Sequence, residues 1–158
     1  MKRSPINWNR HVPLGMDGEK RKNQMAAMLG IGIGGSLYFL LKYFSARSDL
    51  FGYINGKLQR IPNRRMLPFE ELLSGTFTIM AIMALGFVIM AVMFYLYHYQ
   101  GCRSIYTMRR LPDKWELWRR CLTLPVAFLL LSAICTLILI GLYWLLWRFA
   151  TPADAFPL

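Results

Sequence analysis

The chain has 158 residues, of which 56% are hydrophobic and 15% aromatic, and its formal net charge is +11. Soluble domains contain roughly 45 to 50% apolar residues even when glycine is counted, so this composition excludes an ordinary soluble globular domain. The apolar residues are gathered in three long runs, a pattern typical of a membrane protein.

Residues 1–24 are polar and basic, and Lys20, Arg21 and Lys22 stand directly before the first apolar run. A secretory signal peptide has a short basic region before its apolar stretch and a small-residue cleavage site after it. Here the preceding segment is long and no such cleavage pattern follows. We therefore expect a basic cytoplasmic amino-terminal segment and a chain that is retained whole.

The first apolar run, residues 25–44, is predicted to form a transmembrane helix, because a span needs about 20 apolar residues. It includes Lys42, whose ammonium can reach outward to water. Gly30 and Gly34 lie one turn apart and predict close helix packing. A nucleotide-binding glycine loop needs a preceding strand and a following helix in water, so that function is disfavoured. A re-entrant or interfacial course of this glycine-rich run is the alternative.

Residues 45–71 are predicted to form an extracellular loop. Within it, the pair Asn55-Gly56 is typical of a tight hairpin turn. The flanking arms are predicted either as two short strands or as an irregular cap over the helices, and the sequence alone leaves both open.

The second and third transmembrane helices are predicted at residues 72–97 and 122–148. Tyrosines and tryptophans gather where these spans would leave the membrane, as expected of an interfacial belt. The interior of the three spans contains no Asp, Glu, Lys, Arg or His. Ion-coupled and proton-coupled transporters normally need such residues, so the chain is not expected to transport a substrate by itself.

A cytoplasmic loop is predicted at residues 98–121. It contains most of the most informative segment, residues 109–122, which is predicted to form a short amphipathic helix outside the bilayer. Leu111, Trp115, Trp118 and Leu122 follow a helical spacing that makes one apolar stripe. We expect this helix to be a docking element for a partner or for the lipid headgroups. The candidate docking residues are Arg109, Arg110, Leu111, Lys114, Trp115, Trp118, Arg119 and Arg120.

The basic residues predict the orientation of the three spans. The amino-terminal segment and the loop at residues 98–121 carry 12 Lys and Arg, whereas the other side carries 7, namely Lys42 and Arg148 at the ends of their spans and five residues in the loop at 45–71. The extracellular tail at residues 149–158 carries none. The positive-inside rule then places the amino terminus in the cytoplasm. The predicted fold class is an all-α membrane protein with three transmembrane helices and a short amphipathic cytoplasmic helix between the second and third.

Residues for catalysis, for a cofactor or for a metal are not found in the sequence. Cys102, Cys121 and Cys135, with His11 and His98, match no zinc-binding spacing. No catalytic triad, metalloprotease motif or Walker loop is present. The bases lie near membrane ends, which favours anionic lipid over nucleic acid as their partner. We therefore expect a protein that is not an enzyme and has no cofactor of its own.

Residues 99–125, above all the stretch YTMRRLPDKWELWRRCLTLP from Tyr106 to Pro125, resemble the cytoplasmic segment of small multi-span proteins associated with ATP-binding-cassette (ABC) exporters of Gram-positive bacteria. The resemblance implies a permease-type subunit in the bacterial cell membrane, whose helix at residues 109–122 docks as a coupling helix on a separate ATPase that binds ATP and Mg²⁺. It implies an ABC ATPase as partner and leaves open a larger permease subunit. The alternative is a small structural or regulatory membrane protein whose amphipathic helix binds only the lipid interface.

Overall fold

The computed structural model describes residues 8–13, 15–54, 57–61, 64–100 and 115–152. These residues form long helices and one small hairpin. In chain order the elements are the 3-10 helix η1 (Trp8–His11), α1 (Gly18–Ser36), α2 (Tyr38–Ser48), β1 (Phe51–Ile54), β2 (Lys57–Arg60), α3 (Phe69–Leu73), α4 (Thr78–Gln100) and α6 (Trp115–Ala150).

Three helical stretches of the described chain are long and apolar enough to cross a membrane, namely Gly18–Ser48, Thr78–Tyr97 and Trp118–Ala150. The predicted fold class, an all-α membrane protein with three such helices, is confirmed. Large apolar side chains are exposed along each stretch, for example Leu41 at 68%, Leu85 at 60% and Leu137 at 70%. Such a surface would be unfavourable in water and is expected of helices that face lipid.

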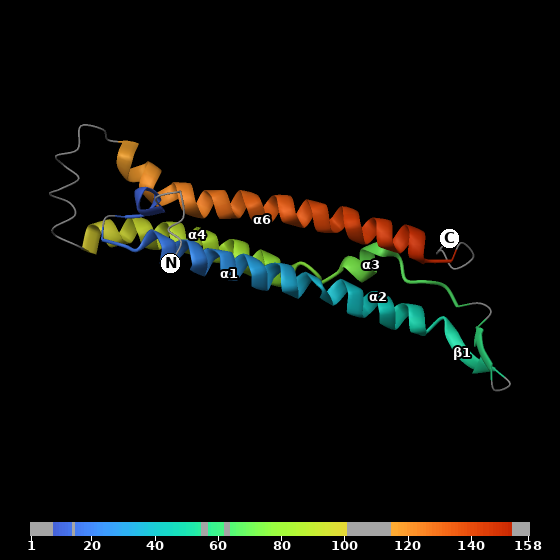
Figure 1. Cartoon of the computed structure of the whole chain (residues 1–158). Helices are drawn as coiled ribbons and strands as arrows, with labels where there is room; N and C mark the ends of the chain where they lie inside the picture. The colour runs from blue at the N-terminus through green and yellow to red at the C-terminus, as the bar shows by residue number, and fades with distance from the viewer. Residues whose placement is uncertain (1–7, 14, 55–56, 62–63, 101–114, 153–158) are drawn as a thin grey trace.

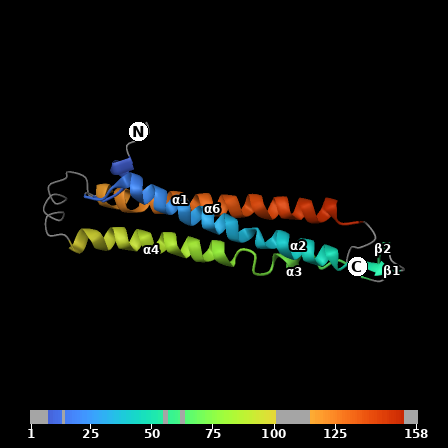
Figure 2. The ribbon, with the colours of Figure 1, turned by 60° about the horizontal axis from the view of Figure 1, so that its bottom comes forward.

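The long helices lie side by side and give the molecule two ends (Figures 1 and 2). The amino-terminal end holds η1, the start of α1, the end of α4 and the start of α6. The hairpin end holds α2, the two strands, α3 and the end of α6. Each end has its own group of buried apolar side chains.

We call these groups the first and the second core. The first core joins α1, α4 and α6 and consists of Val12, Met25, Leu29, Met80, Phe87, Phe94, Cys121 and Leu124. The second core joins α2, α3 and the carboxyl-terminal part of α6 and consists of Phe39, Tyr43, Ala46, Leu50, Met66, Leu72 and Tyr143. The helix α6 is therefore common to both.

The first span differs in detail from its predicted range, residues 25–44. It begins earlier, at Gly18, because the Asp17 carboxylate caps α1 by accepting the Glu19 and Lys20 N–H groups. It is interrupted at Leu37, where α1 gives way to α2. Together α1 and α2 run along the length of the molecule (Figures 1 and 2).

The glycines that allow close packing are not the predicted pair. A Cβ placed on Gly30 or Gly34 would meet no atom within 4 Å, whereas one on Gly32 would lie 2.7 Å from Met80 Sδ and one on Gly35 would lie 2.8 Å from Ile79 Cβ. Within this chain the close approach is therefore made at Gly32 and Gly35, and Gly30 and Gly34 have no close neighbour. The physical reason is the helical phase, since the face that packs on α4 carries Gly32 and Gly35 and leaves the predicted pair exposed.

The hairpin alternative for the predicted loop is confirmed. Strands β1 and β2 pair antiparallel, with Phe51 opposite Arg60 and Ile54 opposite Lys57. The turn residues 55–56 lie outside the described residues. Residues 45–71 also contain the end of α2 and the start of α3, so this segment is more helical than a simple loop.

The second and third spans also begin elsewhere than predicted. Gly75 has a φ of 77°, which ends the short helix α3, and α4 starts only at Thr78. Helix α6 starts at Trp115 and continues to Ala150, so residues 115–122 of the predicted amphipathic helix are its first two turns. Pro125 lies inside α6, and the first turns tilt away from the remainder (Figure 1), as expected near a proline.

The packing of α1 on α4 yields a testable contrast. We expect Gly35→Ala to destabilise the protein by about 1–3 kcal/mol, because the new methyl group would overlap the branched Cβ of Ile79, which side-chain rotation cannot move. Gly34→Ala is the matched control, because its methyl group meets open space. Thermal unfolding of the purified protein in mild detergent measures the difference, and equal midpoints for the two variants would contradict this packing.

Candidate functional site

The amino-terminal end of the molecule carries the described part of the predicted docking segment. The short helix η1 holds the helices together at this end. This short helix packs on both α1 and α6. The side-chain Oδ1 of Asn9 accepts the Gly18 N–H at 2.9 Å, which ties η1 to the first turn of α1. A Cβ on Gly18 would lie 2.5 Å from the Trp8 carbonyl, so glycine is needed for this approach.

Trp118 is held against the second span. Its indole ring stacks on the ring of Tyr95 from α4, with the ring centroids 5.6 Å apart and an interplanar angle of 29°. The side chain is nevertheless 49% exposed. Trp118 therefore joins the start of α6 to the end of α4 and still presents part of its ring outward.

Trp115, one turn earlier, is 76% exposed. A tryptophan ring with so little cover inside its own chain has a large apolar area available for another surface. Because Trp115 belongs to the same continuous helix as Trp118, the stacking on Tyr95 also fixes the position of Trp115 relative to the bundle.

The elements that meet at this end all carry basic residues. We call them the basic collar, and they are Arg10 on η1, Lys20, Arg21 and Lys22 on α1, and Arg119 and Arg120 on α6. One of them, Lys22, places its Nζ 5.2 Å from the centroid of the Trp8 ring, in a cation–π contact. The collar gives the amino-terminal end a positive field that favours acidic groups on a partner or on lipids.

Four of the eight candidate docking residues fall within the described chain. Trp115, Trp118, Arg119 and Arg120 lie together on the first two turns of α6. The other four, Arg109, Arg110, Leu111 and Lys114, lie outside the described residues.

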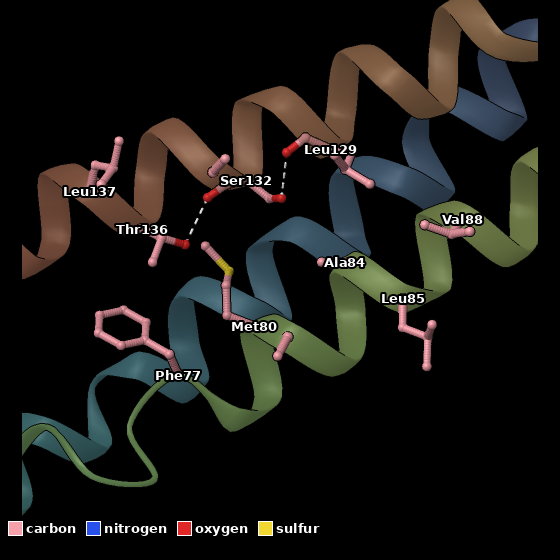
Figure 3. A pocket seen from close by; sticks show the side chains of 11 residues that line it. Phe77, Met80, Ala84, Leu85, Val88, Leu129, Ser132, Thr136 and Leu137 are labelled. Atoms are coloured by element: carbon pink, nitrogen blue, oxygen red, sulfur yellow. Dashed lines mark hydrogen bonds between the residues drawn. The ribbon is translucent and has the colours of Figure 1, made fainter.

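A groove between α4 and α6 was not predicted from the sequence. It has a volume of about 680 Å³ and is lined mainly by apolar side chains, among them Phe77, Met80 and Leu129. Figure 3 shows its two hydroxyl groups on α6: Ser132 donates to the Leu129 carbonyl at 2.7 Å and Thr136 to the Ser132 carbonyl at 2.8 Å. Since both hydroxyls are bonded to the backbone, the groove suits an apolar surface.

Two features that were not predicted, the packing of η1 and the groove, have only weak signals in the sequence. Trp8 stands within an otherwise polar and basic segment, and a large aromatic side chain in such a segment indicates a packed contact. In the structure Trp8 belongs to η1, which makes that contact. The groove has small residues on both of its walls, Ala84 and Ala133 among them, but a pattern of small residues does not reveal which helix lies opposite. Among the described residues no group of three His, Cys, Asp or Glu side chains is placed to hold a metal ion.

Comparison with known proteins assigns the chain to no family: it matches no family model, no curated protein and no solved structure.

The two tryptophans are expected to differ in their effect on stability. Trp118→Ala should lower the free energy of unfolding by about 1 kcal/mol or more, because it removes the stacking on Tyr95. Trp115→Ala should change it by less than about 0.5 kcal/mol, as is usual for an exposed position. Thermal unfolding followed by circular dichroism tests the contrast, and a larger loss for Trp115→Ala would contradict the described packing.

Proposed function

We propose that the chain is a non-catalytic membrane subunit of an ABC-type transporter, with its amino-terminal end on the cytoplasmic side of a bacterial cell membrane. In this proposal the start of α6 binds a separate ATPase subunit and transmits its ATP-driven movement. The sequence resemblance supplies the identity of the partner, and the exposure of Trp115 is the observation that carries the docking role.

Trp115 has the properties of an interface anchor. A few buried aromatic and arginine side chains usually contribute most of the binding energy of a protein interface. Trp115 is 76% exposed in the isolated chain and has Arg119 one turn further along the same helix. Burial of this pair in an acidic pocket would combine apolar contact with charge-assisted hydrogen bonds.

The continuity of α6 supports the transmission of movement. The helix has 36 residues, which corresponds to about 54 Å at 1.5 Å per residue. Its first turns carry the exposed tryptophan, and its last turns pack in the second core. A displacement applied at Trp115 would therefore reach the hairpin end through one continuous helix.

The basic collar supports a cytoplasmic position for this end. Lys and Arg close to the ends of spans are retained on the cytoplasmic side during insertion, and they also attract anionic lipids. In the proposed complex the collar lies between the headgroups and acidic side chains of the ATPase.

A second candidate function is favoured by a different observation. Phe149, at the opposite end of α6, is 81% exposed, so an exposed large aromatic residue is not peculiar to the amino-terminal end. Aromatic side chains at both ends of a span are the normal interfacial belt. In the alternative, Trp115 and Trp118 insert among lipid headgroups and the chain is a structural or regulatory membrane protein.

The deciding experiment compares Trp115→Ala with Phe149→Ala, two exposed aromatic positions at opposite ends of the same helix. Tagged protein is purified in mild detergent from its own host, and a co-purifying chain with a Walker motif is quantified by mass spectrometry and by ATP hydrolysis. Loss of an interface anchor worth about 2 kcal/mol weakens binding about 30-fold. We therefore expect Trp115→Ala, and not Phe149→Ala, to abolish most of the co-purification.

Two outcomes would contradict the proposal. If the unmodified chain brings down no such ATPase, the transporter function fails and the lipid-interface alternative remains. If both variants retain the ATPase equally, the start of α6 is not the docking site.

The proposed orientation has a separate test. Lys20→Cys on α1 and Ser48→Cys on α2 are both exposed positions at opposite ends of the first span. In a variant without the native cysteines, a membrane-impermeant thiol reagent added to whole cells should label Ser48→Cys and spare Lys20→Cys. The reverse pattern would place the amino terminus outside the cell.

A further inference from the structure

The first span is interrupted, and the second is preceded by a break, at one level of the molecule (Figures 1 and 2). In the first span, α1 ends at Ser36 and α2 begins at Tyr38. Before the second, α3 ends at Leu73 and α4 begins at Thr78. Phe77 packs against the second core as well as the first, and its ring centroid lies 6.3 Å from that of Tyr143 on α6. We call residues 36–38 and 74–77 together the joint.

At the interruption of the first span, the Ser36 carbonyl accepts a hydrogen bond from Tyr143 in place of one from the helix backbone. In a continuous helix the Leu40 N–H would donate to the Ser36 carbonyl. Here it donates to the Leu37 carbonyl at 2.9 Å, and the Tyr143 hydroxyl donates to the Ser36 carbonyl at 3.0 Å. The same hydroxyl lies 3.1 Å from Ser36 Oγ, which also donates to the Ile33 carbonyl at 2.6 Å.

These contacts are buried, since Ser36 is 0% and Tyr143 5% exposed. A buried backbone carbonyl without a partner is costly because water cannot reach it. Tyr143 supplies that partner from a helix that passes the joint without a break.

The parts beyond the joint hold together as one unit. Lys42 on α2 donates from Nζ to the Ser74 carbonyl at the end of α3, at 2.7 Å, and α2 packs on α3. Phe39 and Phe69 join the two helices through their rings, with centroids 6.0 Å apart. We call α2, β1, β2 and α3 the hairpin unit.

We propose that the joint is a hinge about which the hairpin unit turns relative to α1 and α4, with the Tyr143 hydroxyl as the latch that holds it closed. Hinges in proteins are a few residues at element ends that absorb the change in backbone angles. Small residues occur at both breaks: Gly34-Gly35-Ser36 end α1, and Ser74-Gly75-Thr76 lie between α3 and α4. The described residues place only Phe77 and the helix α6 in both cores, so most of the packing within each core can be kept while the two turn relative to each other. The hinge does not depend on which partner binds at the amino-terminal end.

Tyr143→Phe tests the latch, because it removes the hydroxyl and keeps the ring that stacks on Phe39 at 4.4 Å. Tyr43→Phe is the matched control: Tyr43 is another buried tyrosine of the second core, but its hydroxyl faces Thr151 Oγ1 at 3.4 Å and not the joint. Ser36→Ala is a second variant that keeps the carbonyl which accepts from Tyr143, and it should have a smaller effect than Tyr143→Phe.

The measurement uses pairs of spin labels on exposed positions in a variant without the native cysteines. Leu41→Cys on α2 with Leu85→Cys on α4 reports across the hinge, and Ile31→Cys on α1 with Leu85→Cys reports within the first core. In Tyr143→Phe we expect the population of open molecules to rise about two- to tenfold, the effect of one lost hydrogen bond. The distance distribution across the hinge should broaden, whereas the distribution within the first core should not change.

An unchanged distribution across the hinge in Tyr143→Phe would overturn the proposal, and so would equal broadening of both pairs. If Tyr143→Phe does not fold, the labelled protein that keeps Tyr143 tests the hinge instead. On heating towards the unfolding midpoint, the pair across the hinge should broaden before the pair within the first core. Simultaneous broadening would show that the two parts do not move separately.

Discussion

Backbone hydrogen bonding is the constraint on which this structure depends. Inside a bilayer no water is present to bond an unpaired carbonyl or N–H group, so the chain must satisfy these groups itself. Long helices do so along most of their length. Where the helices are interrupted, side chains complete the pairing: Tyr143 bonds the Ser36 carbonyl, Thr76 donates to the Leu72 carbonyl, and Lys42 bonds the Ser74 carbonyl.

Helix α6 has a special position because it is common to both cores. Its first turns stack on α4 through Trp118, its middle lines the groove opposite α4, and its last turns carry Tyr143 into the second core. The break within the first span and the break before the second thus lie beside one continuous helix. A signal received at one end of α6 therefore has a direct physical connection to the residue that bonds the interruption at the other end.

The sequence was sufficient for the parts of the fold that depend on hydrophobicity and on turn chemistry. Uninterrupted apolar runs identified three candidate spans, and Asn55-Gly56 indicated the hairpin that β1 and β2 form. The sequence was insufficient where the result depends on which faces of two helices meet. Spacing alone favoured Gly30 and Gly34 as the packing pair, but the phase of α1 against α4 places Gly32 and Gly35 in contact instead.

The candidate site was predictable in the same limited sense. Helical spacing grouped Trp115 and Trp118 on one stripe, and the structure places both on the first turns of α6. Spacing could not show that Tyr95, from the preceding span, would cover Trp118 and leave Trp115 exposed. Nor could it show that these turns continue into the third span, because Pro125 is tolerated within α6 as a bend.

Lys42 has a consequence for the depth at which the molecule sits in lipid. Its ammonium group contacts the Ser74 carbonyl and lies 5.3 Å from the centre of the Tyr38 ring. A lysine at the centre of a bilayer costs roughly 2.5–3.5 kcal/mol, so this charge keeps the neighbouring interruptions near the boundary between headgroups and acyl chains. Rotation of the hairpin unit at this depth would push aside polar headgroups. The free-energy cost of that rotation would vary with the packing of the lipid surface and with membrane thickness.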